Sequence, residues 1–464
     1  MENINNNYLI NQKPIKLLSI FVIPCILSLL ISALYNVVDQ LFIGNSSIGA
    51  IGNTATTIVF PLTCIALAFA LMLGDECAAF MSLKSGNGEN DKLPKAVGNT
   101  LLVGVIISIL FLVICFPLLP QILDFFGAKT EESLKYSLEY GYIILIGIPF
   151  YILSTALNSI IRADGSPKTA MFSMVLGALI NVILDATFIF GCNMGLFGAA
   201  LATIIGQIAS FIVSFIYLFK TKTFKLNLSS FKIEIKDFLH VLKLGLSSFL
   251  TQISIVIISI VSMNLLAKYG MNSIYGANDP QAIFGIVMKI FSIAVNIAVG
   301  IAAGAQPIIG YNYGAKRYDR VKKFLSLILI SNLILGIICT LLFELIPGEI
   351  ISLFGSNSQS PELYLEIGIK TVRIYLAFIT FTLIQKVVAI YLQATDSPIK
   401  ATILSLLRDV IVLVPSMIIL PIFMGIDGIL YSSWITDIVA IIISIIFIIL
   451  EYKKLHKESK KVNN

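Results

Sequence analysis

The chain has 464 residues, of which 57% are hydrophobic and 12% are charged, and its formal net charge is +6. Soluble domains carry about 25% charged residues, so this composition excludes an ordinary soluble protein and predicts a polytopic membrane protein. The basic balance is not a sign of nucleic-acid binding, because most Lys and Arg residues fall on one side of the predicted topology.

The hydropathy pattern predicts an all-α integral membrane protein with twelve spans, because apolar runs long enough to cross a bilayer recur along the whole chain. We place the spans near residues 15–43, 48–82, 94–119, 134–161, 167–190, 196–219, 238–268, 280–312, 321–346, 362–392, 398–423 and 427–451. The breaks between them are short and rich in Gly, Pro, Asn and charges, which leaves no room for a soluble domain.

The second half of the chain repeats the plan of the first half, with an offset of about 230 residues. The matched pairs are Ser166-Pro167 with Ser397-Pro398, Phe126-Gly127 with Phe354-Gly355, and the stretch 195–198 with 425–428. Two similar membrane halves that enclose a site are the usual build of a secondary transporter. We expect two pseudo-symmetric six-helix lobes, at 1–219 and 244–464, the second with a basic cytoplasmic tail.

The positive charges predict the orientation, because Lys and Arg gather on the cytoplasmic side of membrane proteins. If the N-terminus is cytoplasmic, the outer loops hold only Lys129, Lys135, Lys268 and Lys370. We therefore predict that both termini are cytoplasmic. The predicted linker at 220–243 alternates lysines with apolar residues, which suits a segment lying along the cytoplasmic interface; a solvated connector is the alternative.

The cysteines and histidines indicate neither disulfides nor a metal site, so we expect no metal and no cofactor. No CxxC spacing occurs, and His240 and His456 fall far apart at predicted cytoplasmic ends. Five of the six cysteines lie in apolar spans and only Cys192 approaches the outer face, so we interpret them as small packing residues.

Ionisable residues inside the predicted spans are the main functional candidates, because a charge at mid-membrane costs at least about 2.5–3.5 kcal/mol on insertion scales. They are Asp39 in the first span, Asp75 and Glu76 in the second, Asp185 in the fifth, Arg408 and Asp409 in the eleventh, and Asp437 in the twelfth.

The pair Asn181 and Asp185 is the most informative of these, because residues four apart share one helix face. An amide and a carboxyl group side by side can share a proton or a cation, which is the minimum chemistry of a proton- or sodium-coupled antiporter. A structural polar pair that fastens two helices together is the alternative.

The adjacent charges are harder to interpret, because neighbouring helical residues point about 100° apart and cannot both face one cavity. Asp75 is a candidate for a second coupling site, and Glu76 is expected to snorkel or to pair elsewhere. Arg408 needs a partner across the bundle, which Asp409 or Asp437 could supply, and we interpret such a pair as structural.

Several segments have a sequence that is characteristic beyond their composition. They are residues 36–44 (NVVDQLFIG), 181–185 (NVILD), 198–203 (GAALAT) and 304–315 (GAQPIIGYNYGA), with Gln393-Ala394 before Ser397-Pro398 and the stretch 408–415. Together they resemble the multidrug and toxic compound extrusion (MATE) transporters over nearly the whole chain. Within that family the chain is most similar to the bacterial MepA-like branch, itself near the DinF type.

The resemblance implies a V-shaped pair of lobes whose central cavity opens alternately to each side of the bacterial cytoplasmic membrane. It implies an antiporter, not an enzyme, that exports amphipathic, often cationic organic compounds in exchange for H⁺ or Na⁺. We expect a monomer that interacts with small organic substrates and with the lipid bilayer, and not with nucleic acid.

The resemblance also implies a coupling-ion site in the first lobe, which falls on Asp39, Asn181, Asp185 and Thr203. Candidate substrate-contacting or accessory polar residues are Asp75, Asn36, Asn158, Gln306, Lys289 and Arg408. Other branches place a cation site in the second lobe, with acids in the seventh and eighth spans. Here the seventh span carries Gln252 and Asn264 but no matching acid, so we expect no sodium site there.

A flippase for lipid-linked oligosaccharides, from the same wider superfamily, is the alternative function. Such proteins tend to have more spans and a strongly cationic cavity, whereas this chain offers only Lys289, Lys386 and Arg408 as cavity cations. A membrane enzyme would need a convergent catalytic set. Histidine is nearly absent, and the sequence has no phosphate-binding glycine loop with a lysine.

Overall fold

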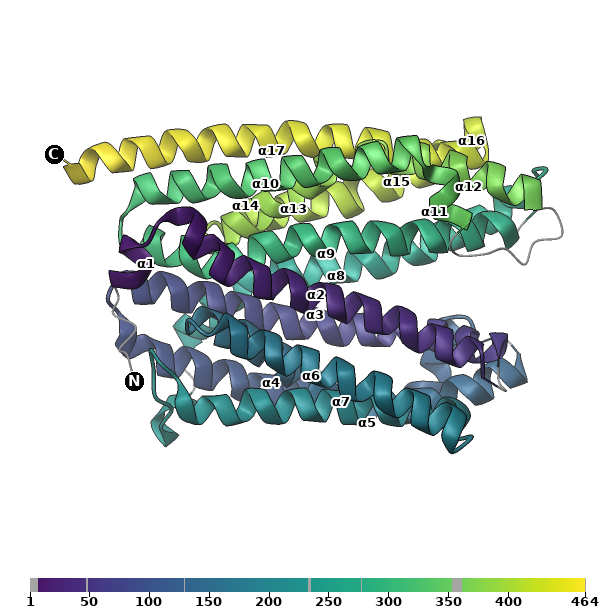
Figure 1. Cartoon of the computed structure of the whole chain (residues 1–464), viewed down its shortest axis with the longest axis horizontal. Helices are drawn as coiled ribbons and strands as arrows, with labels where there is room; N and C mark the ends of the chain where they lie inside the picture. The colour runs from purple at the N-terminus through teal and green to yellow at the C-terminus, as the bar shows by residue number, and fades with distance from the viewer. Residues whose placement is uncertain are drawn as a thin grey trace.

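The computed structural model describes residues 7–46, 49–128, 130–232, 235–276, 278–352 and 361–463. Within these ranges the chain is almost entirely helical, and the long helices run roughly side by side along the molecule (Figure 1). The first half holds α1 (Asn7–Asn11), α2 (Pro14–Gly44), α3 (Ala50–Gly86), α4 (Leu93–Phe125), α5 (Glu131–Ala163), α6 (Pro167–Asp185) and α7 (Gly195–Tyr217). The second half holds α8 (Ile235–Gly270), α9 (Asn278–Gly314), α10 (Tyr318–Leu345), α11 (Pro347–Ser352), α12 (Pro361–Tyr375), α13 (Ile379–Ala394), α14 (Pro398–Leu406), α15 (Leu413–Ile419), α16 (Pro421–Met424) and α17 (Ile426–Asn463).

The predicted all-α membrane fold is confirmed. Among the described residues, 11 helical segments are long and apolar enough to cross a membrane, and α12 and α13 supply a twelfth if the bent pair is one span. Each predicted span coincides with one of these segments. Many of the aliphatic side chains on their outer faces are exposed, as contact with lipid requires.

The tenth span is bent, which the sequence did not predict. α12 and α13 meet at an angle of 47°. In a continuous helix the carbonyl of Ile374 would accept a hydrogen bond from the amide of Phe378. Instead, Trp434 of α17 donates its indole N–H to that carbonyl at 2.7 Å, and Phe378 packs edge-on against the Trp434 ring at 5.1 Å. The freed carbonyl is thus satisfied from a neighbouring helix, as a broken membrane helix requires.

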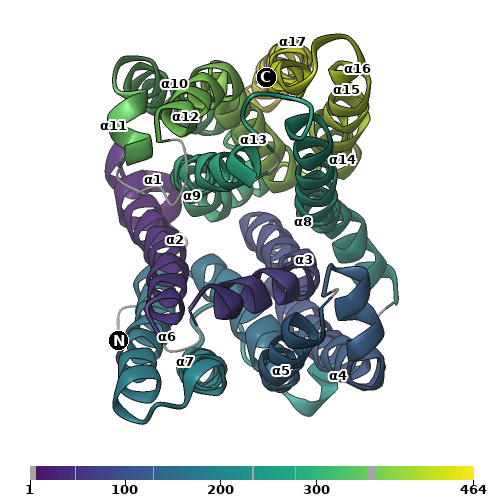
Figure 2. The ribbon, with the colours of Figure 1, turned by 90° about the vertical axis from the view of Figure 1, so that its right-hand side faces the viewer.

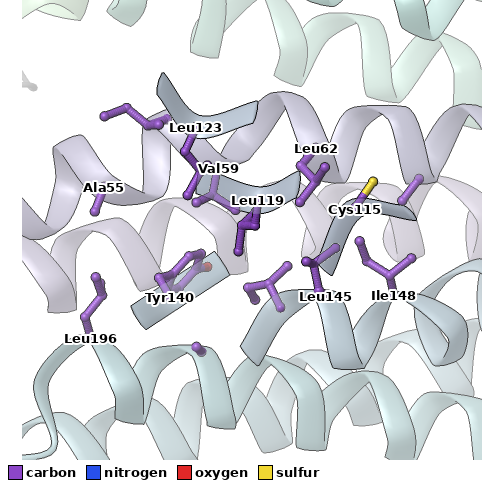
Figure 3. Packing of buried hydrophobic residues seen from close by; sticks show 14 of the residues in the cluster. Ala55, Val59, Leu62, Cys115, Leu119, Leu123, Tyr140, Leu145, Ile148 and Leu196 are labelled. Carbon is purple, nitrogen blue, oxygen red and sulfur yellow. The ribbon is translucent and has the colours of Figure 1, made fainter. Parts of the chain in front are cut away.

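The helices form two groups, which are seen end-on in Figure 2. We call α2–α7 the N-lobe and α8–α17 the C-lobe. A hydrophobic cluster of α3, α4, α5 and α7 fills the N-lobe, and Figure 3 shows Val59, Leu119 and Leu145 among its side chains. α2 contacts both lobes, because Leu17 and Phe21 in its first half pack into a cluster with C-lobe residues such as Phe324.

The predicted linker begins as a packed segment rather than a free one. Phe224 is buried against Phe80 and Val97 of the N-lobe, whereas Leu228 is 94% exposed. Residues 233–234 and the side chains of 235–244 lie outside the described part of the chain. The lobe boundaries at 219 and 244 therefore stay predictions.

The two lobes touch closely toward one end of the molecule, the end that carries Gly86 and Gly314. A methyl group at either glycine would lie 2.1 Å from a backbone oxygen of the other lobe, Tyr311 O or Leu83 O. Such a distance is impossible for a real side chain, so these helices meet backbone to backbone. Gly245 makes a similar approach to Met72 nearer the middle, where a Cβ would lie 2.2 Å from the Met72 oxygen.

Candidate functional site

A small polar cavity lies inside the N-lobe, between α2, α5, α6 and α7. Its volume is about 70 Å³, and its polar lining includes Ser32, Tyr35, Asn158, Asn181, Thr203 and Gln207. Drug-sized ligands usually occupy pockets of about 300–1,000 Å³. In this conformation the cavity therefore suits a few water molecules or a small cation.

Two of the four residues predicted for ion coupling, Asn181 and Thr203, line this cavity, and Asp185 and Asp39 lie next to Asn181 outside the lining. Asp185 is fully buried, and Asn181 and Asp39 are 2% and 9% exposed. Asn181 donates from Nδ2 to Thr203 Oγ1 at 3.4 Å. Asp39 of α2 lies close enough to Asp185 of α6 for their carboxyl groups to interact electrostatically. Three helices thus bring two acids, one amide and one hydroxyl to the same place.

Several oxygens of this cluster have no hydrogen-bond partner among the described residues. They are Asp39 Oδ1, Asn181 Oδ1 and both carboxyl oxygens of Asp185. A buried polar atom without a partner is costly, so such atoms usually mark a site that binds water, a proton or an ion. The cluster is built of oxygen ligands, which suit hard cations or protons rather than soft transition metals. Among the described residues, no group of three or more His, Cys, Asp or Glu side chains could hold a metal ion.

The local helix geometry changes directly after Asp185. Residues Ala186–Gly191 form a π-helical segment, and the regular α-helix ends at the acid itself. π-Helical turns occur frequently at functional sites. Tyr140 of α5 completes the surroundings, because it lies beside Thr203 and interacts electrostatically with both acids. The sequence analysis missed Tyr140, since nothing in its span distinguishes it from the other tyrosines of the chain.

The accessory candidates divide between the cavity and other places. Asn158 lines the cavity and accepts a hydrogen bond from Ser214 at 3.4 Å. Asn36 is exposed, and its side chain donates to the carbonyl of Ser32 on its own helix at 2.7 Å. Asn36 therefore does not belong to the ion cluster.

Asp75 lies outside the cavity, in a polar network of the N-lobe. It accepts hydrogen bonds from Ser159 and from Arg162, the latter at 3.2 Å. Gln306 of the C-lobe points its amide toward the backbone carbonyl of Asp75 at 3.5 Å. With an arginine partner in place, Asp75 has the surroundings of a structural ion pair.

Glu76 pairs with the other lobe instead of snorkelling. Its side chain is completely buried, and Oε1 accepts a hydrogen bond from Ser248 of α8 at 3.1 Å. Of the two expectations for this residue, pairing elsewhere is the one that the structure shows.

The C-lobe holds a buried charge cluster in which each charge has an opposite partner. Arg408 contacts Asp409 at 2.7 Å and Asp437 at 3.1 Å, and Lys386 contacts Asp409 at 2.7 Å. Thr382 donates to Asp437 at 2.8 Å. Arg408 thus pairs with both acids that the sequence offered as its partners, and Lys386 is neutralised by Asp409. That this pairing is structural stays a prediction.

Lys289 differs from those two cations. It lies exposed on α9, and its ammonium group makes no hydrogen bond or ion pair with the described residues.

The comparisons with known proteins agree with this architecture. A family model described as MatE matches residues 24–187 and 247–418, which together make up most of the chain. The chain belongs to the MATE family. This family consists of multidrug efflux transporters, in keeping with the predicted class of function.

Curated relatives extend this MATE match. The multidrug export protein MepA of Staphylococcus aureus is 24% identical over 436 residues, which cover 93% of this chain and 92% of the relative. MepA of Staphylococcus haemolyticus is 25% identical over 426 residues, 90% of each chain.

Solved structures share the MATE fold throughout. The MATE multidrug transporter DinF-BH, solved as a complex, has a TM-score of 0.84 and 31% identity, covering 93% of this chain and 94% of that one. An outward-facing multidrug resistance MATE transporter of the MOP superfamily has a TM-score of 0.88 at 20% identity, covering 99% and 100%. The second likeness concerns the fold alone.

Proposed function

We propose that this MATE chain is a secondary multidrug antiporter, which exports amphipathic, often cationic organic compounds in exchange for H⁺ or Na⁺. The observation that carries the proposal is the meeting of Asp39 and Asp185 inside the N-lobe with unpartnered oxygens. Intramembrane acids of this kind mark ion pathways by default. The names of the MepA relatives and of DinF-BH, all multidrug transporters, support the substrate class.

Ion flow and drug export are coupled because the ion and the organic substrate compete for the N-lobe. When an ion or proton occupies the Asp39–Asp185 cluster, the negative charge that favours an organic cation is neutralised. A ligand shifts a conformational equilibrium only through its different affinities for the two states, so exclusive occupancy by ion or substrate supplies the required difference. Asn181 and Thr203 would orient the acids and complete the oxygen shell.

The orientation assigns a state to this conformation. We place both termini and the Gly86–Gly314 end at the cytoplasmic side, because the lysine-rich segments lie there. The contacts between glycines and the opposite lobe then close the cytoplasmic side. The conformation is accordingly closed to the cytoplasm, as is the state in which an ion enters from outside and a drug leaves.

Transport by purified protein in liposomes tests the proposal. A fluorescent organic cation is followed while a pH gradient or a sodium gradient is imposed separately. We expect wild-type transport to follow one gradient and Asp185→Asn to reduce it to background. Ser19→Ala, a polar change on the exposed face of α2, should leave transport intact. Failure of folded wild-type protein under both gradients, together with movement of a labelled lipid-linked sugar, would instead support the flippase.

A further inference from the structure

Glu76 is an acid of the N-lobe that is enclosed by the C-lobe. It lies on α3, one turn toward the closed end from Met72, whose backbone oxygen meets Gly245 of α8. Ser248 of α8 donates to Glu76 Oε1 at 3.1 Å, and Gln393 of α13 donates in turn to Ser248 Oγ at 3.1 Å. Glu76 Oε2 has no hydrogen-bond partner among the described residues. The interface thus buries a carboxyl group but provides a hydrogen-bond partner for only one of its two oxygens.

The charged neighbours do not compensate a negative charge on Glu76. On α3 its neighbour is Asp75, another acid, and Arg162 of α5 is already engaged by Asp75 at 3.2 Å. Among the side chains that the structure describes, which on α8 begin at Gly245, those that reach this region from α8, α13 and α9 are Ser248, Gln393 and Gln306, and none of them carries a charge.

Burying an ionised carboxylate without a cation is costly, whereas a protonated carboxyl group is neutral and can itself donate a hydrogen bond. When the lobes separate at this end, water reaches Glu76 and stabilises its ionised form. Closure and protonation are therefore linked at this residue: each favours the other.

We propose that Glu76 is a proton-operated latch of the interface between the lobes, which binds a proton when the lobes close around it and releases that proton when they part. The proton is taken from cytoplasmic water and returned to the same water, since the interface opens to that side. Glu76 therefore makes closure respond to cytoplasmic pH without adding a proton to the transported ions. The inference rests on the alternating access proposed above, but not on ion binding at Asp39 and Asp185.

A distance measurement across the closed end tests the latch. Lys168 and Ile399 occupy corresponding exposed positions at the starts of α6 and α14. They are replaced by spin-labelled cysteines in the full chain carrying Cys192→Ser, reconstituted in lipid nanodiscs without substrate. Pulsed electron resonance then gives the fraction of molecules with the short distance as the pH is raised.

In the Glu76-containing protein we expect the short-distance fraction to fall as the pH rises. Glu76→Gln should keep it high at every pH, because the amide is neutral and can still bond to Ser248. Ser248→Ala should lower it at every pH, which provides a second test if Glu76→Gln folds poorly. Glu89→Gln is the matched control: Lys92 and Lys84 lower the pKa of Glu89 to about 2, so this cytoplasmic acid stays ionised throughout.

Repeating the series with Asp185→Asn separates the latch from the ion site. A Glu76-dependent pH response that persists in Asp185→Asn supports the latch even if gradient-driven transport fails. The proposal would be overturned if the short-distance fraction of the wild type did not change with pH, or if it changed equally in Glu76→Gln.

Discussion

The two lobes treat their buried acids in opposite ways. In the C-lobe, Asp409 and Asp437 form ion pairs with Arg408 and Lys386, so two negative charges are balanced by two positive charges. In the N-lobe, Asp39 and Asp185 face each other without a salt-bridge partner among the described residues, and their oxygens are left open. A buried network in which every polar group has a partner holds helices together, whereas one with unpartnered groups needs a ligand to supply the missing partners. The comparison supports the proposal that the C-lobe cluster is structural and that the N-lobe cluster binds the coupling ion.

The two lobes differ in these side chains although they share one backbone feature, a π-helical segment. Each lobe has a π-helical segment in the span that follows its Ser-Pro pair, at Ala186–Gly191 and at Leu407–Val412. In the N-lobe the segment begins after Asp185; in the C-lobe it contains Arg408 and Asp409. The duplicated scaffold is thus similar, and the side chains placed on it determine what each lobe does.

Removing the central cation of the C-lobe should have the largest effect on folding. Arg408→Leu leaves the buried Asp437 with Thr382 as its hydrogen-bond donor among the described residues and with the acid Asp409 nearby. Breaking a buried pair in this way costs about 3–5 kcal/mol. We expect a lower unfolding midpoint in detergent and poor recovery of folded protein. An Arg408→Leu variant as stable as the wild type would show that the C-lobe network is not structural.

The matching change in the N-lobe should spare folding and abolish transport. Asp185→Asn replaces an acid without hydrogen-bond partners by a neutral side chain of the same shape, so its stability should change by less than about 1 kcal/mol. Unfolding curves of wild type and variant check the predicted stability, and liposome transport checks the predicted loss of activity. Loss of stability comparable to that of Arg408→Leu would erase the distinction between the lobes.

The sequence predicted which N-lobe residues lie together better than it predicted the contacts that surround them. The twelve spans follow from hydropathy, and Asn181 and Asp185 are brought together by helical spacing alone. Asp39 and Thr203, by contrast, were assigned through the family resemblance, because no local pattern joins three helices.

Contacts between distant segments could not be predicted. Ser248 lies 172 residues beyond Glu76. Lys386 was a candidate cavity cation, whereas Asp409 of another helix neutralises it. The break between α12 and α13 likewise depends on Trp434, which donates across the bundle. Each case needs a tertiary partner that spacing within one helix does not reveal.

A smaller effect should follow from loss of the hydroxyl that accompanies the acids. Thr203→Val removes the hydrogen bond with Asn181 while keeping the shape of the side chain. Such a bond contributes about 1 kcal/mol, so the apparent affinity for the coupling ion should fall by roughly fivefold. The ion dependence of transport measures this shift. An unchanged ion dependence would remove Thr203 from the site.

The smallest effect should come from an exposed ion pair of the C-lobe. Lys370 and Asp427 are 2.7 Å apart, but their side chains are 34% and 37% exposed. Exposed pairs contribute about 0–1 kcal/mol, so the free energy of unfolding of Lys370→Met should differ from that of the wild type by no more than this amount. If it destabilised the protein as strongly as Arg408→Leu, burial would not be what gives the Arg408 cluster its importance.

The central claim is that the acid pair of the N-lobe, and not that of the C-lobe, binds the coupling ion. Ion release from purified protein on addition of an organic cation tests it most directly, with a pH indicator for protons and a sodium-selective electrode for Na⁺. Counted per folded molecule, we predict release of one of these ions by the wild type, equal release by Asp409→Asn and none by Asp185→Asn. Undiminished release by Asp185→Asn, or loss of release only in Asp409→Asn, would contradict the account.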